Sequence, residues 1–265
     1  ADRIAPDEAP ATAVRRKPDA SIVVGITLQK EGKADAFVSA GSTGAVMAAS
    51  LLMLRPLPGV DRPAVAAMLP TSAGPMVLLD AGANVDCRPE HLVQFARLGV
   101  VYARDVLGRA SPRVGLLNIG EEPEKGNELA VEAHRRLAAT GLDFIGNVEG
   151  REIIEGACDV LVTDGFVGNV LLKFYESVAG FVFGLLDRNL AARDAAADRD
   201  RVTRILDYAE YGGAPLLGVN GISIVCHGGS PPRAITNALK AAVTASNAHM
   251  VGHIRDEVGV HPQHA

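Results

Sequence analysis

The sequence predicts an α/β fold built on a doubly wound, mostly parallel sheet. Two patterns predict this class. Continuous apolar runs at 114–117 and 160–162 are typical of strands that are buried on both faces. Amphipathic segments such as 89–107, which begins at a proline and carries apolar residues at helical intervals, separate these runs. Because the chain has 265 residues, we expect one α/β domain across residues 1–265.

Local signals along the chain predict the individual elements. Gly32 is expected to end a first helix, and Thr43 to cap a later one. Two predicted strands, 64–69 and 76–80, are so close in sequence that we expect an antiparallel pair, or an insertion, within a mostly parallel sheet. In chain order the expected elements are a helix over 21–32, a strand over 34–39, a helix over 45–54, these two strands, the helix over 89–107, a strand over 114–117, a helix over 127–138, a strand over 142–145, a helix over 149–155, a strand over 160–162, a last strand over 219–225 and a final helix over 234–251.

Composition limits the classes of partner and cofactor. The net charge of −5 comes from 26 basic and 31 acidic residues, which predicts no basic surface for nucleic acid. The three cysteines form no CxxC pair and no zinc spacing, so we expect reduced thiols in a cytoplasmic protein and no bound metal. Neither a GxGxxG after a strand nor a P-loop motif is present, and we expect no cofactor. Apolar runs fall short of the ~20 residues that a membrane-spanning helix needs.

Polar residues gather where the predicted strands end. The stretch richest in polar residues is 115–127, where a predicted strand ends in a loop that leads to a helix. Similar strand-to-helix loops, here called corners, recur at 77–84, 144–150 and 160–169. In open parallel sheets, ligands bind at the carboxyl ends of the strands. We therefore interpret these corners as one polar site, although asparagines also close ordinary turns and aspartates also cap helices. The candidate residues are Asp80, Asn84, Asn118, Glu121, Lys125, Asn127, Asn147, Glu149, Asp164, Gly165 and Asn169.

Two glycine-rich loops add further candidates. Gly41–Gly44 reads Gly-Ser-Thr-Gly ahead of a predicted helix, which is an anion site by geometry and helix dipole or else a plain capped turn. His227 begins a second glycine corner after the last strand and is either functional or bonded to backbone. Many hydrogen-bond donors without an obvious nucleophile favour a reaction in which a substrate attacks. Inorganic phosphate is such a nucleophile, and the protein need only position it and stabilise the oxyanion that forms.

The segment 170–210 has a different character. Leu172, Tyr175 and Val178 begin a row of apolar residues at helical intervals, and an Ala-, Asp- and Arg-rich stretch follows. We expect a helical hairpin that projects from the sheet. Its apolar face packs on the core or on a second subunit, or it contacts a membrane surface.

Seven motifs in one order resemble the PlsX family of bacterial phosphate acyltransferases. The motifs are Ser39-Ala-Gly-Ser-Thr-Gly-Ala45, Leu79-Asp-Ala-Gly-Ala-Asn-Val-Asp-Cys-Arg-Pro-Glu-His91, Gly115-Leu-Leu-Asn-Ile-Gly-Glu-Glu122, Lys125-Gly-Asn-Glu-Leu129, Phe144-Ile-Gly-Asn-Val-Glu-Gly150, Thr163-Asp-Gly-Phe-Val-Gly-Asn169 and Tyr211-Gly-Gly-Ala-Pro-Leu-Leu-Gly-Val-Asn220. The resemblance implies that phosphate attacks a fatty acyl thioester of acyl carrier protein, and that a membrane glycerol-phosphate acyltransferase consumes the acyl phosphate. It also implies a Rossmann-like fold similar to isocitrate and isopropylmalate dehydrogenases, a homodimer, and peripheral membrane contact.

From their positions in the sequence we hypothesise roles for the candidate residues. Gly41–Gly44 would hold phosphate, and Lys125 would supply positive charge. Asn118, Asn147 and Asn169 would orient substrate or stabilise the oxyanion, and His227 would protonate the leaving thiolate. The residues expected to orient these groups are Asp80, Asn84, Glu121, Asn127, Glu149, Asp164 and Gly165.

The chain departs from the family pattern in two places. Ser42 stands where the family has asparagine, and the family's first strand with its Asp-Ala-Met-Gly-Gly-Asp loop is absent from this sequence. Two alternatives stay open, and the absent segment bears on the second of them. One is acyl exchange with a coenzyme A thioester, as in phosphate acetyltransferase, and the other is a scaffold without turnover.

Overall fold

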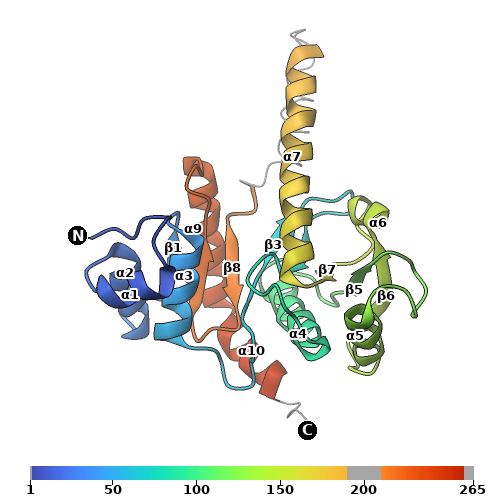
Figure 1. Cartoon of the computed structure of the whole chain (residues 1–265), viewed down its shortest axis with the longest axis horizontal. Helices are drawn as coiled ribbons and strands as arrows, with labels where there is room; N and C mark the ends of the chain where they lie inside the picture. The colour runs from blue at the N-terminus through green and yellow to red at the C-terminus, as the bar shows by residue number, and fades with distance from the viewer. Residues whose placement is uncertain (1, 190–209, 260–265) are drawn as a thin grey trace.

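The chain forms a mixed α/β structure with two sheets side by side (Figure 1). The computed structural model describes residues 2–189 and 210–259. Within them, one sheet has the order β1–β9–β8–β2 and the other the order β3–β4–β7–β5–β6. Helices cover both faces of this arrangement, as a doubly wound fold requires.

The first sheet is mixed. β1 (Ala36–Ser39) and β9 (Ile222–Val225) run parallel, whereas β8 (Ala214–Leu217) is antiparallel to β9 and to β2 (Ala64–Val65). β8 lies between the segment 170–210 and the predicted last strand 219–225, where we expected no strand. Proline and glycine residues in and beside β8 disfavour the prediction of a strand from local sequence. The pairing of β8 depends on strands that are far away in the chain.

The second sheet is mostly parallel, as predicted. β4 (Met76–Leu79), β7 (Val160–Val162), β5 (Val114–Asn118) and β6 (Phe144–Glu149) all run in one direction. β3 (Ala67–Leu69) pairs antiparallel with β4, which confirms the predicted antiparallel pair.

The predicted strand 64–69 is wrong as a single element. Ala64 and Val65 pair with β8, whereas residues 67–69 pair with β4 in the other sheet. Between them, the Ala66 N–H donates to the Pro215 carbonyl oxygen at 2.9 Å. This short stretch therefore joins the two sheets.

The core consists of two layers that both run across the two sheets. One layer lies under α4 (Pro89–Asp105), α5 (Glu128–Ala138), α9 (Pro232–Asn247) and α10 (Met250–Gly259). The other lies under α2 (Ser21–Lys30), α3 (Thr43–Ala49) and α6 (Gly150–Glu155), with α1 (Pro10–Arg16) beside them. Alternate residues of β4 enter opposite layers, because successive side chains of a strand point to opposite faces.

Several predicted helix boundaries need correction. Ser42, not Thr43, caps α3, since its hydroxyl oxygen accepts from the Ala45 N–H. The helix expected over 45–54 changes after Ala49 into a π-helical segment, Ser50–Leu54. The final helix ends earlier than predicted, and His249 in the left-handed region (φ 53°) separates α9 from α10.

α7 (Gly165–Asn189) rises from the second sheet and projects beyond the other described elements (Figure 1). The first arm of the predicted hairpin 170–210 is therefore a helix, and residues 190–209 lie outside the described part of the chain. No helix of the described residues is both long and apolar enough to cross a membrane.

Candidate active site

Four of the predicted corners share one edge of the second sheet. β4, β7, β5 and β6 are parallel neighbours, so the residues that follow them emerge at the same edge. Asp80 follows β4, Asp164 follows β7, Asn118 ends β5 and Glu149 ends β6. The strand order thus brings together corners that are far apart in sequence.

Asp80 organises the corner after β4. Its side chain is fully buried and accepts hydrogen bonds from the Val65 N–H, from the backbone of residues 82–84 and from the Asn84 amide. Burial raises the pKa of the Asp80 carboxyl, and these hydrogen bonds oppose the rise. The Asn84 amide also donates to the Pro63 carbonyl oxygen at 2.9 Å. The hydrogen bonds of both side chains hold this loop, so Asp80 and Asn84 can orient substrate only through the shape of the loop.

The start of α7 locks onto this corner. Asp164 caps the helix, because its carboxylate accepts N–H groups of the first turn at 2.9 and 3.0 Å. The Gly165 N–H donates to the Asn84 carbonyl oxygen at 2.7 Å. A Cβ on Gly168 would lie 1.9 Å from the Asp80 carbonyl oxygen, so this close helix–loop contact requires glycine.

Asn169, one position further along α7, stands apart from the other asparagines. Its side chain packs against Gly82, where an added Cβ would lie 3.3 Å from the Asn169 Cβ. Among the described residues, no hydrogen-bond partner meets its amide. The amide is therefore available to a ligand.

The loop between β5 and α5 is held by asparagines from two strands. The Asn118 amide donates to the Lys125 carbonyl oxygen at 2.9 Å, and the Asn147 amide donates to the Glu122 carbonyl oxygen at 2.7 Å. Asn127 caps α5. These three asparagine side chains therefore hold the loop in place, and any effect that they have on substrate comes from the shape of the loop.

Arg151 is a residue that the sequence reasoning missed. Its guanidinium lies 3.2 Å from a Glu121 oxygen and 2.8 Å from a Glu149 oxygen, and so bridges two corners. Its position two residues after Glu149, in a corner rich in carboxylates, is the signal that could have identified it. In contrast, the exposed Lys125 amine meets no carboxylate among the described residues.

The remaining candidates lie at the edge of the first sheet. β1 and β9 are parallel, so Gly41–Gly44 and His227 emerge together. The Cys226 N–H donates to the Ser39 carbonyl oxygen at 2.8 Å, and Gly228 faces the Ala40 carbonyl oxygen. These contacts place the two glycine loops side by side.

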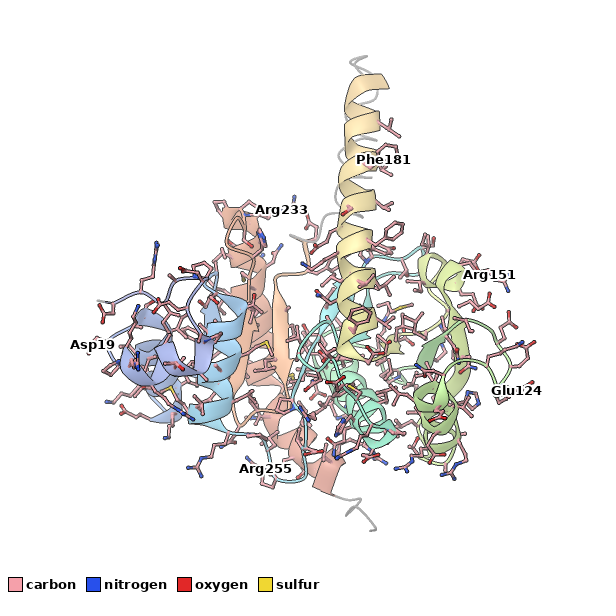
Figure 2. The ribbon with its side chains drawn as sticks, in the orientation of Figure 1. Asp19, Glu124, Arg151, Phe181, Arg233 and Arg255 are labelled. Carbon is pink, nitrogen blue, oxygen red and sulfur yellow. The ribbon has the colours of Figure 1, made fainter. Side chains whose placement is uncertain are left out.

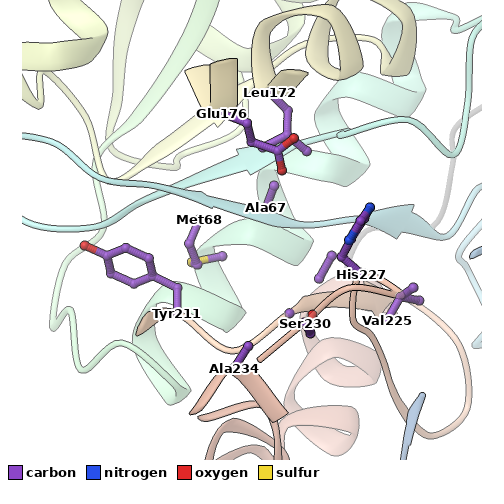
Figure 3. A pocket seen from close by; sticks show the side chains of 11 residues that line it. Ala67, Met68, Leu172, Glu176, Tyr211, Val225, His227, Ser230 and Ala234 are labelled. Carbon is purple, nitrogen blue, oxygen red and sulfur yellow. The ribbon is translucent and has the colours of Figure 1, made fainter. Parts of the chain in front are cut away.

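His227 has a defined tautomer in its neutral form. The Gly229 N–H donates to His227 Nδ1 at 3.1 Å, so the ring proton sits on Nε2. The side chain is exposed and lines a cavity of about 110 Å³ between the two sheets (Figure 3). Figure 3 shows the Glu176 carboxylate and the His227 ring reaching into this space. The cavity walls consist of Ala67, Met68, Leu172, Glu176, Tyr211, Gly213, Ala214, Val225, His227, Ser230 and Ala234.

Hydrogen bonds and packing divide the predicted residues into three groups rather than one. The corners of β4 and β7 form one, those of β5 and β6 the second, and the two glycine loops the third. In Figure 2, α7 stands between Arg233 on one side and Glu124 and Arg151 on the other. Leu172 lines the cavity three residues after Asn169 and hence on the same helix face. α7 is thus the element that connects the first group with the third.

The three thiols are poor nucleophiles. Burial raises the pKa of Cys87 to about 11 and that of Cys158 to about 12, and it also raises the pKa of Cys226. At neutral pH these thiols stay protonated, and a thiolate is the reactive form. Covalent catalysis by cysteine therefore finds no support.

Comparison with known proteins agrees with the motifs. A family model described as "Fatty acid synthesis protein" matches residues 1–252. A phosphate acyltransferase of Desulforamulus reducens is 52% identical over 259 residues, which cover 95% of this chain and 78% of that protein. A phosphate acyltransferase of Moorella thermoacetica is 54% identical over 96% of this chain and 77% of its own length.

Solved structures show the same fold at low sequence identity. A phosphotransacetylase from Staphylococcus aureus aligns with a TM-score of 0.60 and 18% identity over 90% of this chain and 74% of its own. A phosphotransacetylase from Streptococcus pyogenes aligns with a TM-score of 0.57 over 92% and 75% of the two chains. The family match over residues 1–252 and the identity to these phosphate acyltransferases show that the chain belongs to the PlsX family of fatty acid synthesis proteins.

Proposed function

We propose that this protein transfers a fatty acyl group from acyl carrier protein to inorganic phosphate and so forms acyl phosphate for phospholipid synthesis. The observation that carries the proposal is the 52% identity, over 95% of the chain, to an enzyme named phosphate acyltransferase. In this reaction a phosphate oxygen attacks the thioester carbonyl carbon. The C–S bond then breaks, and the carrier thiolate leaves and takes up a proton.

The site chemistry supports attack by the substrate itself. The cysteine thiols stay protonated at neutral pH, so the protein's part is to position phosphate and stabilise the oxyanion. In our proposal, the N–H groups of Gly41–Gly44 hold phosphate where α3 begins. His227, which borders the same loop, donates from Nε2 toward the departing sulfur.

The second sheet supplies the other groups. The Asn169 amide has no partner among the described residues and lies on the helix face on which Leu172 reaches the cavity, so Asn169 is our candidate for stabilising the oxyanion. Lys125 provides mobile positive charge for phosphate, while Asn118 and Asn147 shape the loop that carries it. Arg151 fixes this loop to α6.

The projecting helix supports a homodimer with peripheral membrane contact. Val170, Phe174, Val178, Phe181 and Leu185 are all exposed and recur at helical spacing, which makes one apolar stripe along α7. Figure 2 shows Phe181 on the projecting part of this helix. A stripe of this kind is usually covered by a partner or a membrane. We further propose a Rossmann-like fold of the dehydrogenase type and a cytoplasmic protein that delivers acyl phosphate to a membrane glycerol-phosphate acyltransferase.

A thiol-release assay tests the reaction. Purified protein is incubated with acylated carrier protein with and without phosphate, and free thiol is measured. We expect release that depends on phosphate, and a lower rate when an acyl coenzyme A of equal chain length replaces the carrier protein. Equal rates would favour the coenzyme A alternative, and no phosphate-dependent release would favour a scaffold.

A pair of variants tests the roles within the site. His227→Ala should lower turnover by about 10²-fold, which is typical of a lost catalytic proton donor. His253→Ala is the matched control, because this exposed histidine contacts Asp105 and lies outside the site. Equal turnover of both variants would remove His227 from the mechanism.

A further inference from the structure

The cavity beside His227 has a polar mouth and an apolar floor. Glu176 and His227, which both reach into it in Figure 3, are exposed side chains. The apolar side chains of the lining lie deeper, since Ala67, Met68 and Ala234 are exposed by only 5%, 7% and 2%. A ligand that enters past His227 would therefore meet hydrocarbon.

The floor is rigid because it is built where the two sheets meet. Ala67 and Met68 belong to β3, which is paired with β4 of the second sheet. On the other side, Val225 at the end of β9 is paired with Ala214 of β8 in the first sheet. Leu172 of α7 adds a further wall. Paired strands and close-packed side chains give way little, so the size of the cavity limits what it can hold.

The charges of the lining disfavour phosphate as the occupant. Among the lining residues that the structure describes, none is Lys or Arg, so no cation would neutralise an anion there. The Glu176 carboxylate has no cation within ion-pair distance in the described part of the chain and would repel a second negative charge. The part of a substrate that fits this space is therefore neutral and apolar.

The acyl group of the thioester meets this requirement. With its sulfur near the Nε2–H of His227, its carbonyl lies at the mouth and the next carbons point toward the floor. A CH₂ group is about as large as a water molecule, whose share of the liquid is about 30 Å³. The cavity volume of about 110 Å³ thus holds about three or four such carbons and leaves little room for a branch on them.

We propose that this cavity binds the carbons next to the thioester carbonyl, and that Met68 and Leu172 restrict them to an unbranched chain. This role rests on the acyl transfer proposed above and names the side chains that select the acyl group. Shortening either side chain would make room for a branch.

A comparison of two acylated carrier proteins tests the selection. Hexanoyl and 2-methylhexanoyl carrier protein are compared in the thiol-release assay with phosphate. We expect the straight chain to be preferred by about tenfold or more in kcat/KM, since one additional methyl-sized group in an apolar pocket has an effect of this order. Met68→Ala and Leu172→Ala should each lower this preference by about tenfold. A general structural defect would slow both substrates alike and leave their ratio unchanged.

Leu171→Ala is the matched control for these variants. Leu171 is the neighbouring leucine of α7, is half-buried like Leu172, and does not belong to the described lining of the cavity. This variant should keep the preference of the wild type. Because Leu172 is only half-buried, its variant also serves if Met68→Ala fails to fold.

Methionine methyl resonances give a readout that needs no turnover. The chain has five methionines, and the Met68 signal is assigned by its loss in Met68→Leu. The hexanoyl thioester of N-acetylcysteamine is added without phosphate, and N-acetylcysteamine alone represents the thiol arm of the carrier. We expect only the acylated probe to shift the Met68 signal, whereas the signal of Met250, which is buried under α10 and outside the described lining, should not move.

Three results would overturn the proposal. These are an equal Met68 shift with N-acetylcysteamine alone, no shift up to about 10 mM of the acylated probe, or an unchanged preference in both Met68→Ala and Leu172→Ala at retained turnover. Failure of the wild type to release thiol from either carrier protein would contradict the acyl transfer itself. The Met68 signal would then decide by itself whether the cavity binds the acyl group, so the two failures are distinguishable.

Discussion

Asn147 gives the sharpest test of how the asparagines work. The side chain is buried, and its amide donates to the Glu122 carbonyl oxygen at 2.7 Å while its oxygen accepts from His134 Nδ1 at 2.9 Å. Asn147→Ala removes both bonds. At about 1 kcal/mol for each net hydrogen bond, we expect a loss of about 2 kcal/mol in the free energy of unfolding. For a chain of this size, that corresponds to a Tm lower by about 4–8 °C.

The comparison with Asn169 separates positioning from catalysis. Asn169→Ala removes an amide without a partner in the described structure, so its Tm should stay within about 1 °C of the wild type. Its turnover should nevertheless fall by about 10²-fold if the amide binds the oxyanion. Thermal unfolding by circular dichroism and the thiol-release assay measure the two quantities. An Asn147→Ala variant with unchanged Tm and lost turnover would refute the assignment of Asn147 to the loop.

Three other changes test the packing, the charge and the thiols. Gly168→Ala should lower the Tm by more than about 5 °C, because its methyl group would stand 1.9 Å from the Asp80 carbonyl oxygen and displace α7. Lys125→Ala should lower turnover by about 10²-fold at unchanged Tm, with its exposed neighbour Glu124→Ala as the control. Raising the pH above about 9 should destabilise the fold, since an unfolded thiol ionises there whereas Cys87 stays protonated up to a pKa of about 11. The contribution of this thiol to the free energy of unfolding is therefore present below the pKa of the unfolded thiol and is lost as the pH rises. Urea titrations at alkaline pH should show that the free energy of unfolding of Cys87→Ala declines less steeply with pH than that of the wild type.

Local patterns were sufficient for most of the elements. Apolar runs predict β5 and β7, and a proline start predicts α4, because these signals lie within a few neighbouring residues. They also predict that Asp80, Asp164 and Asn118 lie at or just after strand ends, which places them at one edge once the strands are parallel. The sequence therefore placed the candidate residues in the loops at the carboxyl ends of the strands.

Pairing between distant residues was not predictable in the same way. β8 was missed, and the stretch 64–69 was assigned to one strand although it serves two sheets. Val65 pairs with Leu216, a residue on another strand far along the chain. Nothing local distinguishes such a partner from other apolar candidates, since strand pairing is decided by packing of the whole sheet.

The sequence by itself determined the alternation of strands and helices, the family, and the residue types that stand at the strand ends. Only the tertiary structure decided which of these polar groups are used up and which remain free. Asn118 and Asn147 both donate to loop carbonyl oxygens, whereas the Asn169 amide and the Lys125 amine have no partner among the residues that the structure describes. The physical reason is that a side chain's hydrogen-bond partner depends on three-dimensional proximity, which no spacing along the chain encodes.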